Sequence, residues 1–181
     1  MGSNKIVLDP GHGGDDNGAS YGFTDEDDIT LSICFLLRRE LEKEGYEVHL
    51  TREKDEFVSL NHRCIFANNL PADLFISIHC DAWHVETVSG ISTHVYESGS
   101  KASFKLAESI QKILLENFPD HLNRGVKKAR FYVLRYTNMP AVLIECEFIS
   151  NPETRKFLKE PENQLALVGA IKEGIIKGGT S

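Results

Sequence analysis

The feature that most constrains the fold of this chain is the alternation of short apolar runs with longer amphipathic segments. The run Asp73–Cys80 (DLFISIHC) is the strongest strand pattern, because aliphatic residues alternate with Phe75, Ser77 and His79. The segment Asp27–Glu44 carries apolar residues along most of its length and is followed by Gly45, a common residue just beyond a helix. Strands that alternate with helices favour an α/β protein.

Further strands and helices are expected along the rest of the chain. We predict strands at Lys5–Asp9, Tyr46–Leu50, Ile91–Glu97, Phe131–Arg135 and Ala141–Phe148, and helices at Leu60–Asn69, Lys101–Asn117, Glu153–Leu158 and Glu162–Ile176. A length of 181 residues suits one domain, and we assign that domain to residues 1–177. Residues 178–181 (GGTS) are typical of the start of a flexible linker, which suggests an absent second module.

Charge and composition exclude several classes of function. The formal net charge is −7, which disfavours non-specific binding to nucleic acid or to anionic lipid. No apolar run has the roughly 18–20 residues of a membrane-spanning helix, so we expect no membrane insertion. The first residues lead directly into a predicted strand, so we expect no export signal within this sequence. Its four cysteines form no CxxC pair, and we predict buried free thiols.

Two histidines lie where predicted strands end, and ligands of open α/β sheets gather beyond the carboxyl ends of strands. His12 lies in the glycine-rich turn after the first strand, and His79 ends the DLFISIHC run. A glycine-rich turn can also cradle phosphate, but the neighbouring aspartates suit a cation better. Glu26 precedes the first long helix, where a carboxylate can instead have the structural role of stabilising the positive end of the helix dipole. Together, His12, Glu26 and His79 form a His₂Glu set that suits a catalytic zinc with an open fourth position.

A pair of glutamates occupies the apolar run Ala141–Phe148. Burial of an unpaired carboxylate is costly, so a glutamate in such a strand has either a function or solvent contact at a sheet edge. Alternation places Glu145 and Glu147 on one face, with Cys146 on the other. One of the two can be the general base that activates a water molecule.

Taken in order, these segments resemble the zinc-dependent N-acetylmuramoyl-L-alanine amidases of the type found in bacterial autolysins and phage endolysins. The resemblance extends from Ile6 to about Ile176. It is carried by Leu8–Gly14 (LDPGHGG), Glu26–Leu31 (EDDITL), Leu50–Arg52 (LTR), Arg63 with Ala67–Asn68, Ser77–Ala82 (SIHCDA), Asn123–Lys127 (NRGVK), and Pro140–Glu145 (PAVLIE) with Phe148–Asn151 (FISN).

The resemblance implies a fold, a cofactor and a reaction. The fold is a three-layer α/β arrangement, in which a mixed, roughly six-stranded sheet is flanked by helices on both faces. His12, Glu26 and His79 are implied as the ligands of Zn²⁺, and Glu145 as the catalytic residue. The implied reaction is hydrolysis of the amide between N-acetylmuramic acid and L-alanine of the peptidoglycan stem peptide. A zinc-activated water attacks, and the glutamate acts as general base and then as general acid.

Two residues depart from the pattern of this family. Asp81 stands where asparagine is usual and is a candidate for substrate contact, and Glu147 stands where glycine is common. Like-charge coupling from these carboxylates can shift the pKa of Glu145. Arg124 and Lys127 are candidate anchors for stem-peptide carboxylates, with a solvated basic cluster as the alternative.

The resemblance also sets expectations for location and partners. We expect a monomeric catalytic domain that acts at the bacterial cell wall, outside the cell or in the periplasm, with a wall-binding module beyond residue 181. The lack of an export signal suits a chain trimmed of its signal or a phage endolysin released by other means. Two other functions remain open: a zinc peptidoglycan peptidase that uses the same site, and a non-catalytic wall-binding module.

Overall fold

The computed structural model describes residues 5–179, and a six-stranded sheet forms its middle layer. The strand order is β4-β1-β5-β8-β6-β7. The strands are β4 (Glu47–Leu50), β1 (Lys5–Pro10), β5 (Leu74–Asp81), β8 (Ala141–Phe148), β6 (Ile91–Tyr96) and β7 (Asn123–Ala129). All neighbouring pairs are parallel except β6 and β8, so the predicted mixed sheet is confirmed.

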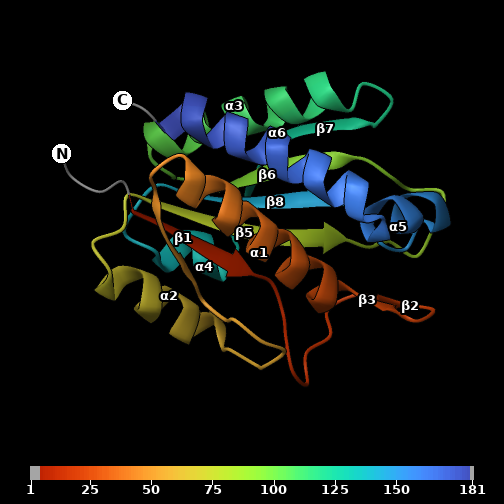
Figure 1. The fold of residues 1–181 in the computed structure, drawn as a ribbon, viewed down its shortest axis with the longest axis horizontal. Coiled ribbons are helices and arrows are strands. Elements are labelled where there is room, and N and C mark those ends of the chain that lie inside the picture. Colours follow the sequence, from red (N-terminus) through yellow and green to blue (C-terminus); the bar gives the residue numbers. More distant parts are fainter. Residues whose placement is uncertain (1–4, 180–181) are drawn as a thin grey trace.

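Helices cover both faces of the sheet and complete the predicted three layers (Figure 1). One face packs against α1 (Glu26–Lys43), α3 (Lys101–Asn117), α5 (Pro152–Lys159) and α6 (Pro161–Gly179), and this side holds the larger core. The other face packs against α2 (Leu60–Asn69) and α4 (Tyr132–Tyr136) around a smaller core. Strands buried on both faces explain the near-continuous apolar runs of the sequence.

Most predicted elements are confirmed, but one strand prediction is wrong. Residues 131–135, predicted as a strand, belong largely to the short helix α4, where the adjacent side chains of Val133 and Leu134 are both buried in the smaller core. The strand that borders β6 is instead β7, which the analysis of the sequence did not identify. Its sequence NRGVKKA lacks strong alternation because this edge strand is only partly buried. A two-stranded hairpin of β2 (Ser20–Tyr21) and β3 (Thr24–Asp25) was also not predicted.

The last helix runs past the domain boundary predicted from the sequence. Helix α6 extends to Gly179, and Gly178 is buried, so these two glycines are helical rather than part of a linker. An added Cβ at Gly178 would lie 2.8 Å from the Cβ of Ser109, which shows how closely α6 approaches α3. The rest of the predicted linker, residues 180–181, lies outside the described residues.

Two further expectations concern burial and membrane association. All four cysteines are buried and free, as predicted. Among residues 5–179, no helix combines the length and the apolar character needed to cross a bilayer.

Candidate metal centre

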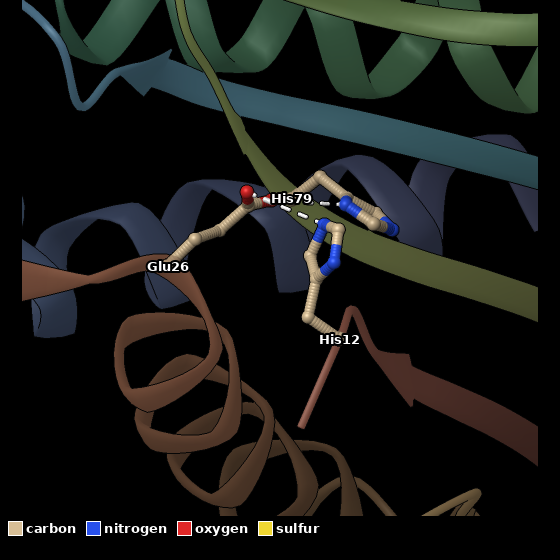
Figure 2. Close-up of side chains that lie close together, drawn as sticks. All are labelled: His12, Glu26 and His79. Carbon is tan, nitrogen blue, oxygen red and sulfur yellow. Dashed lines mark hydrogen bonds and ion pairs between the residues drawn. The ribbon is translucent and has the colours of Figure 1, made fainter. Parts of the chain in front are cut away.

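Three side chains from distant parts of the sequence converge at the carboxyl ends of β1 and β5. His12 follows β1, His79 lies near the end of β5, and Glu26 is the first residue of α1. One ligand atom from each lies within 4.8 Å of the others, an arrangement that can hold a metal ion. Figure 2 shows the carboxylate of Glu26 directed at both imidazole rings. The convergence predicted for these three residues is therefore confirmed.

His12 reaches the centre because the backbone turns sharply after β1. Its φ of 60° is the only positive value among non-glycine residues of the described chain, and such a conformation is unfavourable for a residue with a Cβ. The turn also brings the chain close to His79, since a Cβ added at Gly11 would overlap the imidazole of His79. The glycine at position 11 thus makes room for the second histidine.

Two buried arginines hold this turn in place. The Arg63 guanidinium donates hydrogen bonds to the carbonyl oxygens of Pro10 and His12, and it pairs with Asp9 at 2.8 Å. Arg52 donates to the carbonyl oxygens of Pro10 and Gly11. The sequence suggested that Asp9 could favour a cation, but its charge is neutralised by Arg63. A buried guanidinium needs hydrogen-bond acceptors, and here backbone carbonyl groups and, for Arg63, a carboxylate supply them.

The carboxylate of Glu26 is 4% exposed and uses both oxygens. Oε1 accepts a hydrogen bond from the backbone N–H of Cys80 at 3.0 Å and lies 3.0 Å from Nδ1 of His79. Oε2 accepts from the N–H of Ala19 at 3.0 Å and lies 3.3 Å from Nε2 of His12. The backbone donors fix the carboxylate, so its position does not depend on the histidines alone.

Asp16 orients the first histidine from outside the cluster. Its Oδ1 lies 2.9 Å from Nδ1 of His12 and accepts a hydrogen bond from the N–H of Gly18 at 3.1 Å. A carboxylate on one ring nitrogen fixes the tautomer and leaves the other nitrogen free to bind a metal. Because the Asp16 carboxylate is an acceptor, the neutral His12 ring would carry its proton on Nδ1, while Nε2 faces Glu26 at 3.3 Å.

The pKa values follow from this crowding of charge. Burial disfavours the charged form of His12, but the hydrogen bonds and charges of Glu26 and Asp16 outweigh it and raise the pKa of His12 to about 9. Burial likewise opposes charge on His79, yet Glu26 and Glu145 raise its pKa. Burial disfavours the ionised form of Glu26, but its hydrogen bonds to both histidines hold its pKa well below the ordinary value. The centre is thus a buried anion between two basic imidazoles.

A cavity of about 610 Å³ opens over these residues and includes Glu145 in its lining. Glu145 lies opposite His79 in the sheet register, on the neighbouring strand β8. Burial raises its pKa to about 7, although the charge of His79 opposes the shift. Its Oε2 is buried and has no hydrogen-bond partner in the described chain. A carboxyl group with a pKa near neutrality suits proton transfer in both directions.

Glu147 does not share the face of Glu145, so the prediction from strict alternation is wrong. His79 pairs with Glu145 and Asp81 with Phe148, so β8 carries one more residue than β5 between the two pairs. Such a bulge redirects the side chains that follow it. The Glu147 carboxylate is fully buried away from the cavity, where it accepts from the N–H of Gly90 at 2.7 Å and lies 2.9 Å from Nδ1 of His121.

The three candidate substrate contacts differ in position. Asp81 lines the cavity, whereas Arg124 and Lys127 on β7 do not. The Nε of Arg124 donates to the Ser89 carbonyl at 2.7 Å, and its guanidinium lies 4.5 Å from the centroid of the Phe148 ring. Burial raises the pKa of Asp81, while the charges of Lys127 and Arg124 oppose the shift. The charges of both residues therefore act on Asp81, although neither residue lines the cavity.

Two histidines have buried partners that sequence reasoning did not reveal. His121 pairs with Glu147 and packs against Phe157, with ring centroids 4.5 Å apart. Nε2 of His94 lies 3.1 Å from the Ser92 hydroxyl, and burial lowers the pKa of His94 to about 4. Neither belongs to the metal cluster.

A His₂Glu cluster at the carboxyl edge of a mixed sheet, with a buried glutamate on the neighbouring strand, is typical of α/β enzymes that use a catalytic metal. The family model described as N-acetylmuramoyl-L-alanine amidase matches residues 6–177. The chain belongs to this family, as the resemblance indicated.

Curated proteins and solved structures agree with this family. The chain is 38% identical over 174 residues to "Probable cell wall amidase LytH" of Staphylococcus aureus, an alignment that covers 94% of the chain and 56% of the relative. The chain thus spans a little over half the length of this curated relative. An N-acetylmuramoyl-L-alanine amidase structure from Clostridium difficile 630 matches with a TM-score of 0.93 and 33% identity, covering 96% of the chain and 95% of the other. AmiC2 of Nostoc punctiforme matches with a TM-score of 0.90 and 38% identity, covering 97% and 98%.

Proposed function

We propose that the protein is a zinc-dependent N-acetylmuramoyl-L-alanine amidase that cleaves the amide between N-acetylmuramic acid and L-alanine in peptidoglycan. The observation that carries the proposal is the convergence of His12, Glu26 and His79 beside Glu145 on one cavity. Membership of the amidase family supports the choice of substrate.

The donor set fits zinc. Two imidazole nitrogens and one carboxylate oxygen are the ligands of many catalytic zinc sites, which keep a further position for water or substrate. The ligand atoms are already within 4.8 Å of one another, and Asp16 holds His12 in a tautomer that can bind a metal. When bound, zinc would polarise the scissile carbonyl and lower the pKa of water from ~15.7 toward ~7.

Glu145 supplies the proton transfers in this proposal. It takes a proton from the attacking water and returns it to the nitrogen of the leaving amine, so the C–N bond breaks as a C–O bond forms. Its pKa of about 7 suits both steps. Burial maintains this raised pKa, because bulk water does not stabilise the charge of a buried carboxylate. Because Oε2 has no partner in the described chain, one carboxyl oxygen is available to the reactants.

Substrate binding and cellular location form part of the proposal. We assign Asp81 to substrate contact from within the cavity, and Arg124 and Lys127 to long-range attraction of the stem-peptide carboxylates. The domain acts as a monomer at the bacterial cell wall. Because its net charge of −7 gives it no bulk attraction to polyanionic walls, an attached wall-binding module would provide that affinity.

Digestion of purified peptidoglycan tests the activity. The products are labelled at their new amino termini and identified by mass spectrometry. An amidase frees the amino group of L-alanine, whereas a peptidase on the same site frees amino groups further along the stem peptide. The proposal is wrong if other amino termini appear, or if the zinc-loaded protein leaves the wall intact as a non-catalytic module would.

A further inference from the structure

The turn that carries His12 needs support from outside the strand that precedes it. The φ of 60° at His12 is unfavourable for a residue with a Cβ, and the φ values of Gly13 and Gly14 that follow are also positive. A strained conformation of this kind persists only where the surrounding structure fixes it. The groups that bind the carbonyl oxygens of this turn therefore help to keep Nε2 of His12 facing Glu26.

Arg63 connects the turn to helix α2 through all three of its guanidinium nitrogens. Nη2 donates to the carbonyl oxygen of His12 at 2.6 Å. Nη1 donates to the carbonyl oxygen of Pro10 and pairs with the Asp9 carboxylate at 2.8 Å. Nε donates to the carbonyl oxygen of Val58 at 2.9 Å, just before the helix begins. The guanidinium, which is buried, thus links α2 directly to the backbone of a proposed metal ligand.

The end of this link that lies on the sheet is fixed. Besides Arg63, the buried Asp9 carboxylate accepts hydrogen bonds from the hydroxyl groups of Ser77 at 2.8 Å and Thr51 at 2.6 Å. Arg52 also donates to the turn, but it follows Thr51, whose N–H continues the bonding of β4 to β1. Of the two arginines, Arg63 is therefore the one that comes from a separately docked helix.

Helix α2 has a small contact with the rest of the molecule. Of its ten residues, the buried ones are Arg63, Cys64 and Ala67. At the far end, the Asn68 side chain donates to the carbonyl oxygen of Tyr136 and accepts from the N–H two residues further on, both at 2.8 Å. An element with so few buried apolar contacts opens at a low cost in free energy. One buried guanidinium is thus a large share of what holds α2 in place.

We propose that Arg63 is a positioning residue that couples the docking of α2 to metal binding at His12. With α2 docked, Arg63 holds His12 in the conformation that suits the metal. When α2 moves away, the turn loses this support and the affinity for the metal falls. Linkage makes the effect reciprocal, so a bound metal strengthens the docking of α2. The inference rests on the proposed metal centre and adds the helix that controls it.

A substitution at the far end of α2 tests the coupling without touching the turn. Asn68→Ala removes two hydrogen bonds that hold α2, and we expect the affinity for zinc, measured by calorimetry, to fall on the order of 3- to 10-fold. Asn163→Ala is the matched control, because the Asn163 side chain also donates to a backbone carbonyl, that of Phe157 at 3.1 Å, but belongs to α6. The control should bind zinc as tightly as the parent chain.

Arg63→Lys separates charge from geometry. Lysine keeps a positive charge beside Asp9, but its single ammonium group does not reproduce the planar fork that reaches the carbonyl oxygens of Pro10 and His12. We expect the variant to fold and to bind zinc on the order of 10-fold more weakly. Denaturant unfolding of the metal-free variant, beside that of Asn163→Ala, shows whether the loss of affinity exceeds what lower stability alone produces.

Amide hydrogen exchange measures the reverse effect. Zinc should slow exchange of the α2 amides on the order of 10-fold in the parent chain, and by less in Arg63→Lys. Helix α5 is the comparison, because it has a single buried residue, Leu158, and packs on α6 and β8. Exchange in α5 should change little.

The outcomes separate the coupling from the proposed metal centre. If the parent chain binds zinc and both Asn68→Ala and Arg63→Lys bind it equally tightly, the coupling is wrong while the metal centre stands. Equal slowing of exchange in α2 and α5 would also overturn the coupling, because it would reflect general stabilisation by the metal. If the parent chain binds no zinc, the metal centre is wrong and the coupling fails with it.

Discussion

Nδ1 of His79 lies 3.0 Å from Oε1 of Glu26, although 53 positions separate the two residues in the sequence. The other oxygen of the same carboxylate faces His12. Without a metal, the carboxylate stabilises protons on the two imidazoles. A bound metal ion would take the place of those protons, because the same atoms are its proposed ligands. This competition makes metal binding depend on pH.

We expect zinc affinity to rise with pH up to about 9. The pKa of His12 is raised to about 9, so below that pH the ring must lose a proton before it binds the metal. Calorimetric titration of zinc into metal-free protein, in buffers of different ionisation enthalpy, should show proton release that grows as pH falls. Affinity that is constant between about pH 6 and about pH 8, without proton release, would contradict the ligand role of His12.

The stability of the metal-free protein should fall as pH rises from about 6.5 to about 9. Protonation of His12 stabilises the fold fully below its ordinary pKa of 6.5, and this contribution is lost as pH rises through about 9. Below this range, ionisation of Glu145, whose pKa is raised from 4.5 to about 7, destabilises the fold as pH rises. Deprotonation of His94, whose pKa is lowered to about 4, opposes that effect. Glu26 stays ionised throughout because its pKa is lowered. Thermal unfolding with and without zinc measures the effect, and a metal-free Tm that increases toward pH 9 would disagree with it.

Glu145→Gln should separate catalysis from metal binding. The amide keeps the size of the side chain but cannot accept the proton of water, so we expect kcat to fall on the order of 10²–10⁴-fold. Zinc content should stay at one ion per chain, because Glu145 is outside the ligand cluster. Elemental analysis beside the rate assay checks both points. Loss of zinc from this variant would show that Glu145 belongs to the metal site.

Glu147→Ala should lower stability and leave catalysis nearly unchanged. The substitution removes the acceptor of two backbone N–H groups, those of Gly90 and Phe148, and the partner of His121. Each buried donor without a partner costs about 1–3 kcal/mol, so we expect a loss of roughly 3 kcal/mol in the free energy of unfolding. Denaturant titration and rates at a temperature where the variant is folded provide the comparison. A 100-fold loss of rate at unchanged stability would instead point to Glu147 as the base.

Gly11→Ala should disturb the metal centre by steric overlap alone. The added Cβ would overlap the His79 ring, so the ring has to move away from Glu26. We expect zinc affinity to fall by at least about 10-fold. Gly169→Ala is the control, since the Cβ added there in α6 would meet nothing within 4 Å beyond the neighbouring residues and backbone of its own helix. That change should stabilise the helix by about 0.5–1 kcal/mol, and equal zinc affinity in both variants would show that Gly11 does not limit the site.

The elements with strong periodicity could be predicted from the sequence, and those at the edge of the sheet could not. The run DLFISIHC becomes β5 almost residue for residue, because alternation over a buried strand is a local property. By contrast, residues 131–135 contain residues that favour strands, yet they form a helix because Val133 and Leu134 fill a core made by α2 and the sheet. The partly buried β7 gave too weak a pattern to be recognised.

For the site, the sequence by itself determined the chemistry: it placed two histidines and a glutamate next to element ends, where side chains meet at one edge of a sheet. Only the tertiary structure decided how these groups are arranged. Glu145 lines the cavity, and the bulge that follows it in β8 directs Glu147 away. Arg63 neutralises Asp9 from a distant helix. The physical reason is that residue type and spacing are local, whereas register, burial and pairing depend on contacts between segments far apart in the chain.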